Sequence, residues 1–330
     1  MNQHMRDHHA AAEPRHSGES AVTGPWEPVD QRRWQLGEGA RYLGSEKTGG
    51  AGESGGAGGF VCVDLLQGRL FSTPGEPGSQ LRLRAEMDRP LGAVAPAAAE
   101  AGWETGTWVA ALGKGLSLLR AEDGLLHETE LIASPADRRE EPELRVNDAV
   151  ADPHGRFWVG AMAYGGDQGR GFLARLDPDG SVSVVLEEMS IPNGPAFSVD
   201  GRTMYLADTP TGWISTYDVD PATGTLSEPQ KFVKISEGGP DGMTVDAEGC
   251  LWQAVWGASC LHRYSPSGEL LERIPVPVRQ PTSVALSAEA PYRVLVTSAT
   301  IGLEEPAEHD GRVITAEVRV PGRPADRFRG

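Results

Sequence analysis

Cysteine is scarce in this chain, and the few that occur do not point to a metal site. The 330 residues contain three cysteines, an odd number with no metal-ligand spacing. Cys62 and Cys250 lie in short apolar segments, where a thiol packs as a small hydrophobic group. Unpaired thiols suit a reducing compartment, so we expect a cytoplasmic protein.

Long apolar runs are also missing. No segment approaches the length needed to span a bilayer, so we expect no membrane partner. Residues 1–25 lack the basic and then apolar pattern of a secretory signal. They are rich in histidine and contain no apolar run, which predicts a disordered N-terminal extension before a single domain at residues 26–330. A metal-binding tail is the alternative interpretation of the histidines.

The sequence also lacks clusters of basic residues and the periodicity of amphipathic helices. The net charge is −17, which argues against a nucleic-acid partner. No stretch of ten or more residues has the apolar spacing of an amphipathic helix, so helical and α/β folds are disfavoured.

The chain does contain a strand signature that returns six times. Its markers are Phe60, Trp108, Trp158, Tyr205, Trp252 and Val294, at steps of 48, 50, 47, 47 and 42 residues. Strands and polar turns flank each signature, which gives four strands per repeat. This pattern predicts an all-β fold, a six-bladed β-propeller with four-stranded antiparallel blades. A generic β-sandwich with chance periodicity is the alternative. We expect residues 312–320 to close the ring with a strand from the N-terminal region.

Polar residues recur at one place in the repeat, 11 or 12 residues before the marker. They are Asn147, Asn193, Asp241 and Thr282, and Glu38 leads similarly into the first blade. The first strand of each propeller blade lines the central channel, so these side chains should gather at one mouth. Carboxylate and amide oxygens suit a hard divalent cation, with Ca²⁺ first, Mg²⁺ or Mn²⁺ next and Zn²⁺ not excluded. The alternative is that Asn-Gly and Asp-Gly simply form turns. Because strands alternate, Asp148 is expected to point away from the mouth or along the blade, and to stabilise a turn.

Several motifs resemble those of the SMP-30/gluconolactonase/luciferin-regenerating enzyme (LRE) family. The resemblance covers about residues 34 to 328 and rests on the combination of motifs. Its segments are GEG at 37–39, RVND at 145–148, DPHGR at 152–156, IPNG at 191–194, PDGM at 240–243, QPTS at 280–283 and GRP at 322–324.

This resemblance implies a site and a reaction. It implies one divalent cation bound by Glu38, Asn193 and Asp241, with substrate contacts from Arg145 and Asn147. Asp241 would also be the general base while the metal polarises a lactone carbonyl. The chain departs from the family pattern in the segment 163–167 (AYGGD), which shapes the choice of substrate.

Two classes of function follow. The first is a gluconolactonase-like, metal-dependent hydrolase of a small sugar lactone, present as a monomer or small homo-oligomer. The second is a non-enzymatic propeller that binds a ligand or protein and keeps a structural cation; a phosphotriesterase-like hydrolase on the same architecture is a further alternative. The glycine-rich insert at residues 47–59 is expected to be a flexible loop.

Overall fold

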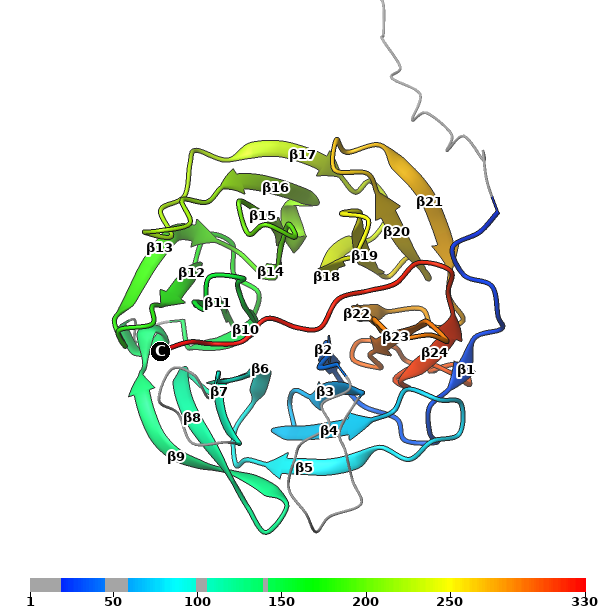
Figure 1. Cartoon of the computed structure of the whole chain (residues 1–330), viewed down its shortest axis with the longest axis horizontal. Coiled ribbons are helices and arrows are strands. Elements are labelled where there is room, and N and C mark those ends of the chain that lie inside the picture. Colours follow the sequence, from blue (N-terminus) through cyan, green and yellow to red (C-terminus); the bar gives the residue numbers. More distant parts are fainter. Residues whose placement is uncertain (1–18, 45–58, 99–105, 139–141) are drawn as a thin grey trace, which may run out of the picture.

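The computed structural model describes residues 19–44, 59–98, 106–138 and 142–330. In these residues the strands form six four-stranded antiparallel sheets around a central axis, which confirms the predicted six-bladed propeller (Figure 1). The described residues contain no α-helix, only the two short 3₁₀ segments Pro135–Arg138 and Thr209–Thr211. None of their helices is long and apolar enough to cross a membrane.

Strands follow one another outwards from the axis in the first five blades. Their bounds are β2 (Gly37–Tyr42), β3 (Phe60–Asp64), β4 (Arg69–Thr73) and β5 (Arg82–Glu86); β6 (Leu91–Pro96), β7 (Thr107–Leu112), β8 (Gly115–Glu122) and β9 (Leu125–Ala133); β10 (Leu144–Ala151), β11 (Phe157–Ala163), β12 (Gly171–Leu176) and β13 (Val182–Met189); β14 (Pro192–Phe197), β15 (Thr203–Asp208), β16 (Trp213–Asp218) and β17 (Gln230–Lys234); β18 (Gly239–Val245), β19 (Leu251–Trp256), β20 (Cys260–Tyr264) and β21 (Leu270–Pro275).

The sixth blade joins the two ends of the chain. It contains β22 (Pro281–Leu286), β23 (Arg293–Ser298), β24 (Ile314–Glu317) and, as its outermost strand, β1 (Glu27–Pro28). In the register, Pro28 lies opposite Ile314. The predicted closure of the ring by an N-terminal strand is therefore confirmed. The sixth blade has four strands because β1 pairs with β24.

Part of the segment expected to be an extension packs against this blade. Val22 forms a β-bridge with Val318, and the amide of Thr23 donates to the Glu317 carbonyl at 2.9 Å. Ala21 is buried. Contact with the propeller thus begins before the predicted boundary at residue 26. Residues 1–18 and the glycine-rich insert, apart from Gly59, lie outside the described residues.

A repeated aspartate fixes the turn between the first two strands of blades three and five. In the third blade, Asp152 Oδ2 accepts the indole N–H of Trp158 at 2.9 Å, while Oδ1 accepts two backbone amides of the turn. In the fifth, Asp246 Oδ2 accepts the indole N–H of Trp252 at 2.8 Å in the same way. Both tryptophans are fully buried between blades. In these two blades the spacing in the sequence therefore reflects a turn whose aspartate accepts a hydrogen bond from the buried tryptophan of the next strand.

All three cysteines are free and buried, as expected for core thiols. Cys62 belongs to the cluster that packs the first blade against the sixth, with Trp34, Phe60 and Leu295.

Every inner strand carries a register irregularity near its start. The pairing with the next strand shifts at 38/41, 91/93, 146/149, 193/196, 240/243 and 281/283. A bulge of this kind breaks the strict alternation of side chains and re-aims residues towards one side. In this protein the shift falls at or beside Glu38, Asn147, Asn193 and Asp241 in four of the inner strands.

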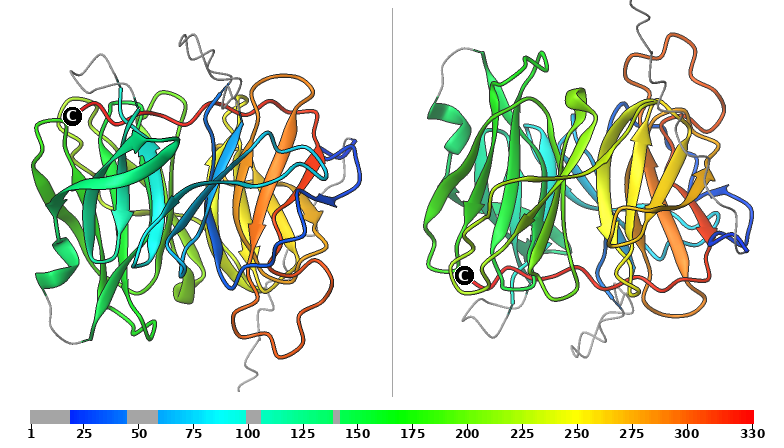
Figure 2. Two further views of the ribbon diagram at one scale, coloured as in Figure 1. Left: turned by 90° about the horizontal axis from the view of Figure 1, so that it is seen from below. Right: turned by 90° about the horizontal axis from the view of Figure 1, so that it is seen from above.

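The last ten residues cross the opposite end of the channel. This C-terminal strap (residues 321–330) runs over one face of the disc, as Figure 2 shows. Its backbone bonds to the ends of inner strands or to nearby turns of five blades, through Ala247, Ser287, Tyr42, Pro96 and Gly155. The channel is thus covered at the end where the inner strands finish, and the strap does not cover the end where they start, which is the predicted mouth.

Candidate functional site

The predicted site residues lie at the starts of four inner strands. Glu38 is in β2, Asn147 in β10, Asn193 in β14 and Asp241 in β18. Each is within or beside the register shift of its strand, and each is between 4% and 6% exposed. Burial of four polar side chains at one level of the channel is costly unless each finds a partner.

A chain of hydrogen bonds connects three blades at this level. Arg145 Nη1 donates to Asn147 Oδ1 at 2.9 Å, and Asn147 Nδ2 donates to Asn193 Oδ1 at 2.7 Å. Asn193 Nδ2 then donates to the hydroxyl of Thr209 at 2.9 Å, which itself donates to the Pro240 carbonyl. Both amides therefore keep fixed orientations. Sequence reasoning missed Thr209, which lies outside the repeated position and follows the fourth signature.

The corresponding residue of the sixth blade has a structural role. Thr282 is fully buried, and its hydroxyl donates to the Gly37 carbonyl and contacts Thr297. The second blade carries Gly92 at its register shift, where the inner strand lies very close to the backbone of Asn147. Four of the six blades therefore supply polar side chains, and two supply close packing.

The acidic groups of the site strongly affect one another. Burial and the nearby Asp148 carboxylate raise the pKa of Glu38 to about 8. Burial, Glu38 and Asp148 together raise the pKa of Asp241 well above its usual range. Three oxygens, Glu38 Oε2, Asp241 Oδ1 and Asp148 Oδ2, are buried without a hydrogen-bond partner.

The turn-stabilising role expected of Asp148 is wrong, because its carboxylate pairs with Arg41 of the first blade. Its carboxylate is 3% exposed and lies close enough to Glu38 and Asp241 to raise the pKa of both. The reason is the register shift between Val146 and Ala149, which cancels the alternation on which the expectation depended.

These donors fit a hard divalent cation. The cluster offers the carboxylate oxygens of Glu38 and Asp241 and the amide oxygen of Asn193, the donor type that such a cation prefers. Buried carboxylates without partners are costly, and a cation bound by Glu38 and Asp241 would reduce that cost for these two groups. Another group in the described residues, Asp246, Glu248 and Cys250, brings possible ligand atoms within 4.8 Å of one another. There, however, the Asp246 oxygens already accept the turn amides and the Trp252 indole.

Arg145 faces the mouth beside an exposed aromatic ring. Its guanidinium carbon lies 5.9 Å from the ring centroid of Tyr164, and burial lowers its pKa. Arg145 is 6% exposed, whereas Tyr164 is 50% exposed. Tyr164 belongs to the segment 163–167 in which the sequence departs from the family pattern. The structure therefore places this departure at the entrance to the predicted site.

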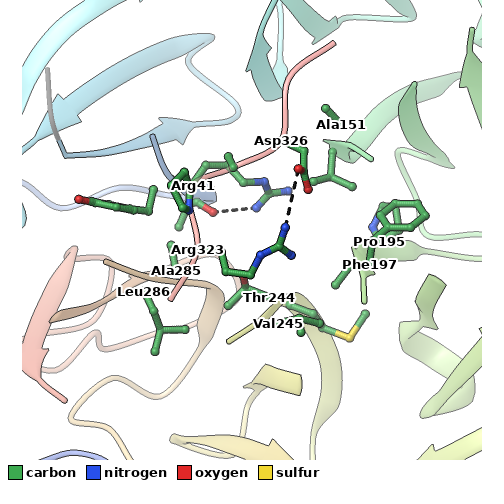
Figure 3. Close-up of a pocket in the computed structure, with 17 residues that line it drawn as sticks. Arg41, Ala151, Pro195, Phe197, Thr244, Val245, Ala285, Leu286, Arg323 and Asp326 are labelled. Atoms are coloured by element: carbon green, nitrogen blue, oxygen red, sulfur yellow. Dashed lines mark hydrogen bonds and ion pairs between the residues drawn. The ribbon is translucent and has the colours of Figure 1, made fainter. Parts of the chain in front are cut away.

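A small cavity lies at the covered end of the channel. It measures about 60 Å³ and is lined by ends of inner strands together with Arg323 and Asp326 of the C-terminal strap (Figure 3). Arg41 also lines it and reaches from this side towards Asp148, to which its Nη2 donates at 2.8 Å. This cavity is separate from the predicted mouth, since it lies where the inner strands end.

The fold and the site together define a class of protein: a six-bladed propeller with a buried, oxygen-rich acidic cluster at the open end of its channel. Residues 36–300 match the family model described as "SMP-30/Gluconolactonase/LRE-like region". The chain belongs to this family.

Known relatives agree with this assignment. The chain is 33% identical over 274 residues to 6-deoxy-6-sulfogluconolactonase of Pseudomonas putida, which covers 81% of this chain and 90% of the relative. A solved calcium-binding protein, regucalcin from Agrobacterium tumefaciens, has a TM-score of 0.78 at 26% identity and covers 93% and 97% of the two chains. A luciferin-regenerating enzyme has the same fold, with a TM-score of 0.79 at 24% identity over 93% and 99%.

Proposed function

We propose that this protein is a metal-dependent lactonase that opens a small sugar lactone. The observation that carries the proposal is the set of buried carboxylates with unpartnered oxygens, next to the Arg145–Asn147 pair at the open end of the channel. The name of the Pseudomonas putida relative, a sulfogluconolactonase, supports a sugar lactone as the substrate class.

Glu38, Asn193 and Asp241 would hold the cation. They come from three blades and supply two carboxylates and one amide oxygen. Calcium is the first candidate because all these donors are oxygens, and the calcium-binding description of the Agrobacterium relative agrees with it. When bound, the cation would polarise the lactone carbonyl.

Asp241 would act as the general base. Its carboxylate is 4% exposed, and Oδ1 has no hydrogen-bond partner with which a reacting water would compete. A carboxylate has two oxygens, so it can contact a cation and still accept a proton from the attacking water. The water oxygen would bond to the carbonyl carbon as Asp241 takes its proton, the bond from that carbon to the ring oxygen would break, and Asp241 would return the proton to the leaving oxygen to give a hydroxy acid.

Arg145 and Asn147 would orient the substrate. The hydrogen bonds of Arg145 to Asn147 and to the Val146 carbonyl both use Nη1. A guanidinium has five N–H donors, so Arg145 has others with which to bind lactone oxygens. Because the bond to Asn147 fixes the guanidinium, little orientation would be lost on binding.

The test is a pH-indicator screen of aldonolactones with chelator-treated and Ca²⁺-reloaded protein. We expect hydrolysis to disappear on chelation and to return on reloading. Hydrolysis that survives complete metal removal would overturn the metal-dependent mechanism. A protein that binds the cation but hydrolyses none of the lactones would instead be the non-enzymatic propeller.

A further inference from the structure

The backbone carbonyl just before each proposed cation ligand accepts a hydrogen bond from a side chain of the neighbouring blade. The three bonds run from Asn147 Nδ2 to the Pro192 carbonyl before Asn193 at 3.1 Å, from Thr209 Oγ1 to the Pro240 carbonyl before Asp241 at 2.7 Å, and from Thr282 Oγ1 to the Gly37 carbonyl before Glu38 at 2.5 Å. In each case the donor belongs to the preceding blade around the ring (Figure 1). These bonds therefore fix the backbone from which each ligand side chain extends.

Thr209 also determines which way the Asn193 amide is turned. A threonine hydroxyl has one hydrogen, and here the Pro240 carbonyl accepts it. The Thr209 oxygen can therefore only accept, and it accepts from Asn193 Nδ2 at 2.9 Å. The amide oxygen of Asn193 consequently points away from Thr209. There it accepts from Asn147 Nδ2 at 2.7 Å and keeps a second lone pair, which is available to a cation.

The position of Thr209 is itself well fixed. Its amide donates to the Ile191 carbonyl at 3.1 Å, and its carbonyl accepts from the Gly212 amide at 3.0 Å in the short 3₁₀ turn that follows β15. A Cβ atom at Gly239 would lie 2.8 Å from the Thr209 methyl carbon, so the start of β18 packs directly against this side chain. The hydroxyl is thus held in one place between the fourth and fifth blades.

We propose that Thr209 and Thr282 are positioning residues of the cation site. Thr282 fixes the backbone before Glu38. Thr209 fixes the backbone before Asp241 and also orients the amide of Asn193. The inference rests on the proposed function, because it takes Glu38, Asn193 and Asp241 as the ligands. It adds two hydroxyl groups that act on cation binding through these ligands.

The experiment is calorimetric titration of Ca²⁺ into the chelator-treated full-length protein. Thr209→Val and Thr282→Val keep the shape of the side chain but remove its hydrogen bonds. We expect each variant to bind Ca²⁺ about tenfold more weakly, because groups that orient metal ligands contribute to metal affinity on this scale. Thr209→Ser and Thr282→Ser keep the hydroxyl and should retain the wild-type affinity.

The matched control is Thr315→Val. Thr315 is fully buried in the sixth blade, and its hydroxyl donates to the Val294 carbonyl at 3.0 Å. Val294 pairs with Leu286, at the opposite end of the inner strand from Thr282. The control should lower the melting temperature of the chelated protein, as Thr282→Val does, but leave Ca²⁺ affinity unchanged. An equal loss of affinity in this control would show a general structural effect and overturn the inference.

The two ways in which the inference can fail are distinguishable. Wild-type Ca²⁺ affinity in Thr209→Val would overturn the positioning role of Thr209 while the cation site stands, and the same result in Thr282→Val would do so for Thr282. Thr209 is only partly buried, so its variant decides the question even if a change at the fully buried Thr282 prevents folding. Failure of the wild-type protein to bind any Ca²⁺ would instead overturn the proposed cation site, and the positioning roles with it.

Discussion

Asp241 has two proposed roles, cation ligand and general base, which one substitution can separate. Asp241→Asn keeps an oxygen that can bind a cation but loses the basic carboxylate. We expect Ca²⁺ to be retained with weaker affinity, while the turnover of lactones falls by about 10²-fold or more, as for loss of a general base. Metal binding is measured by calorimetry and turnover by the indicator assay.

The matched variant is Glu38→Gln, which changes a ligand without a proposed proton transfer. Its activity should recover in part with excess Ca²⁺, whereas that of Asp241→Asn should not. Wild-type turnover by metal-loaded Asp241→Asn would show that Asp241 is only a ligand.

Tyr164 should determine how well the substrate is held. Its half-exposed ring covers one side of the Arg145 guanidinium, where an arriving lactone would meet it. We expect Tyr164→Ala to raise KM several-fold with a smaller effect on kcat, because the contact is the same in the ground state and the transition state. Tyr164→Phe keeps the ring and should retain the wild-type KM. A fall in kcat at constant KM would place Tyr164 in the chemical step instead.

The acidic cluster predicts how stability depends on pH. In the cation-free protein the pKa of Glu38 is raised from 4.5 to about 8, so the folded state holds a proton that the unfolded state releases. The stabilising contribution is fully present below about 4.5 and is lost as pH rises through about 8. The raised pKa of Asp241 acts in the same direction.

We therefore expect the melting temperature of chelated protein to fall between pH 5 and 8 relative to that of Glu38→Gln. Added Ca²⁺ should stabilise more as pH rises, because ligands must lose their protons to bind. Parallel pH profiles for the wild type and Glu38→Gln in chelator would contradict this expectation.

At the scale of the strands, the sequence could predict the pattern but not the bulges. The repeat of turn and aromatic residue, such as Asp152 with Trp158, is local and gives the number of blades and the position of each inner strand. The polar residue near the start of an inner strand can also be found from the sequence, because it lies 11 or 12 residues before the marker. Asp148 was misplaced because a register shift depends on backbone pairing, which alternation alone does not reveal. Arg41 and Thr209 were missed because Arg41 bonds to Asp148 and Thr209 to the Pro240 carbonyl, each in another blade.

Gly92 shows how closely two neighbouring inner strands pack. A Cβ atom at this position would lie 1.8 Å from the Asn147 carbonyl oxygen, so β6 must approach β10 with no side chain between them. We expect Gly92→Ala to displace Asn147, lower the melting temperature and raise KM. Gly24→Ala is the matched control, since its added Cβ would meet Glu317 atoms at an ordinary 3.5 Å. Equal melting temperatures for the two variants would contradict the close packing.

At the scale of the whole molecule, the proposed cation joins blades that are distant in the chain. Glu38, Asn193 and Asp241 belong to blades one, four and five, while the C-terminal strap fastens the opposite end of the channel. Binding to the folded state alone stabilises by about 2.7 kcal/mol when free metal is a hundredfold above its dissociation constant. We expect chelation to lower the melting temperature and re-addition of Ca²⁺ to restore it. Glu38→Gln should melt nearly alike with and without chelator, because losing the charge of one ligand weakens Ca²⁺ binding. A wild-type melting temperature that chelator leaves unchanged near neutral pH would mean that no cation links these blades.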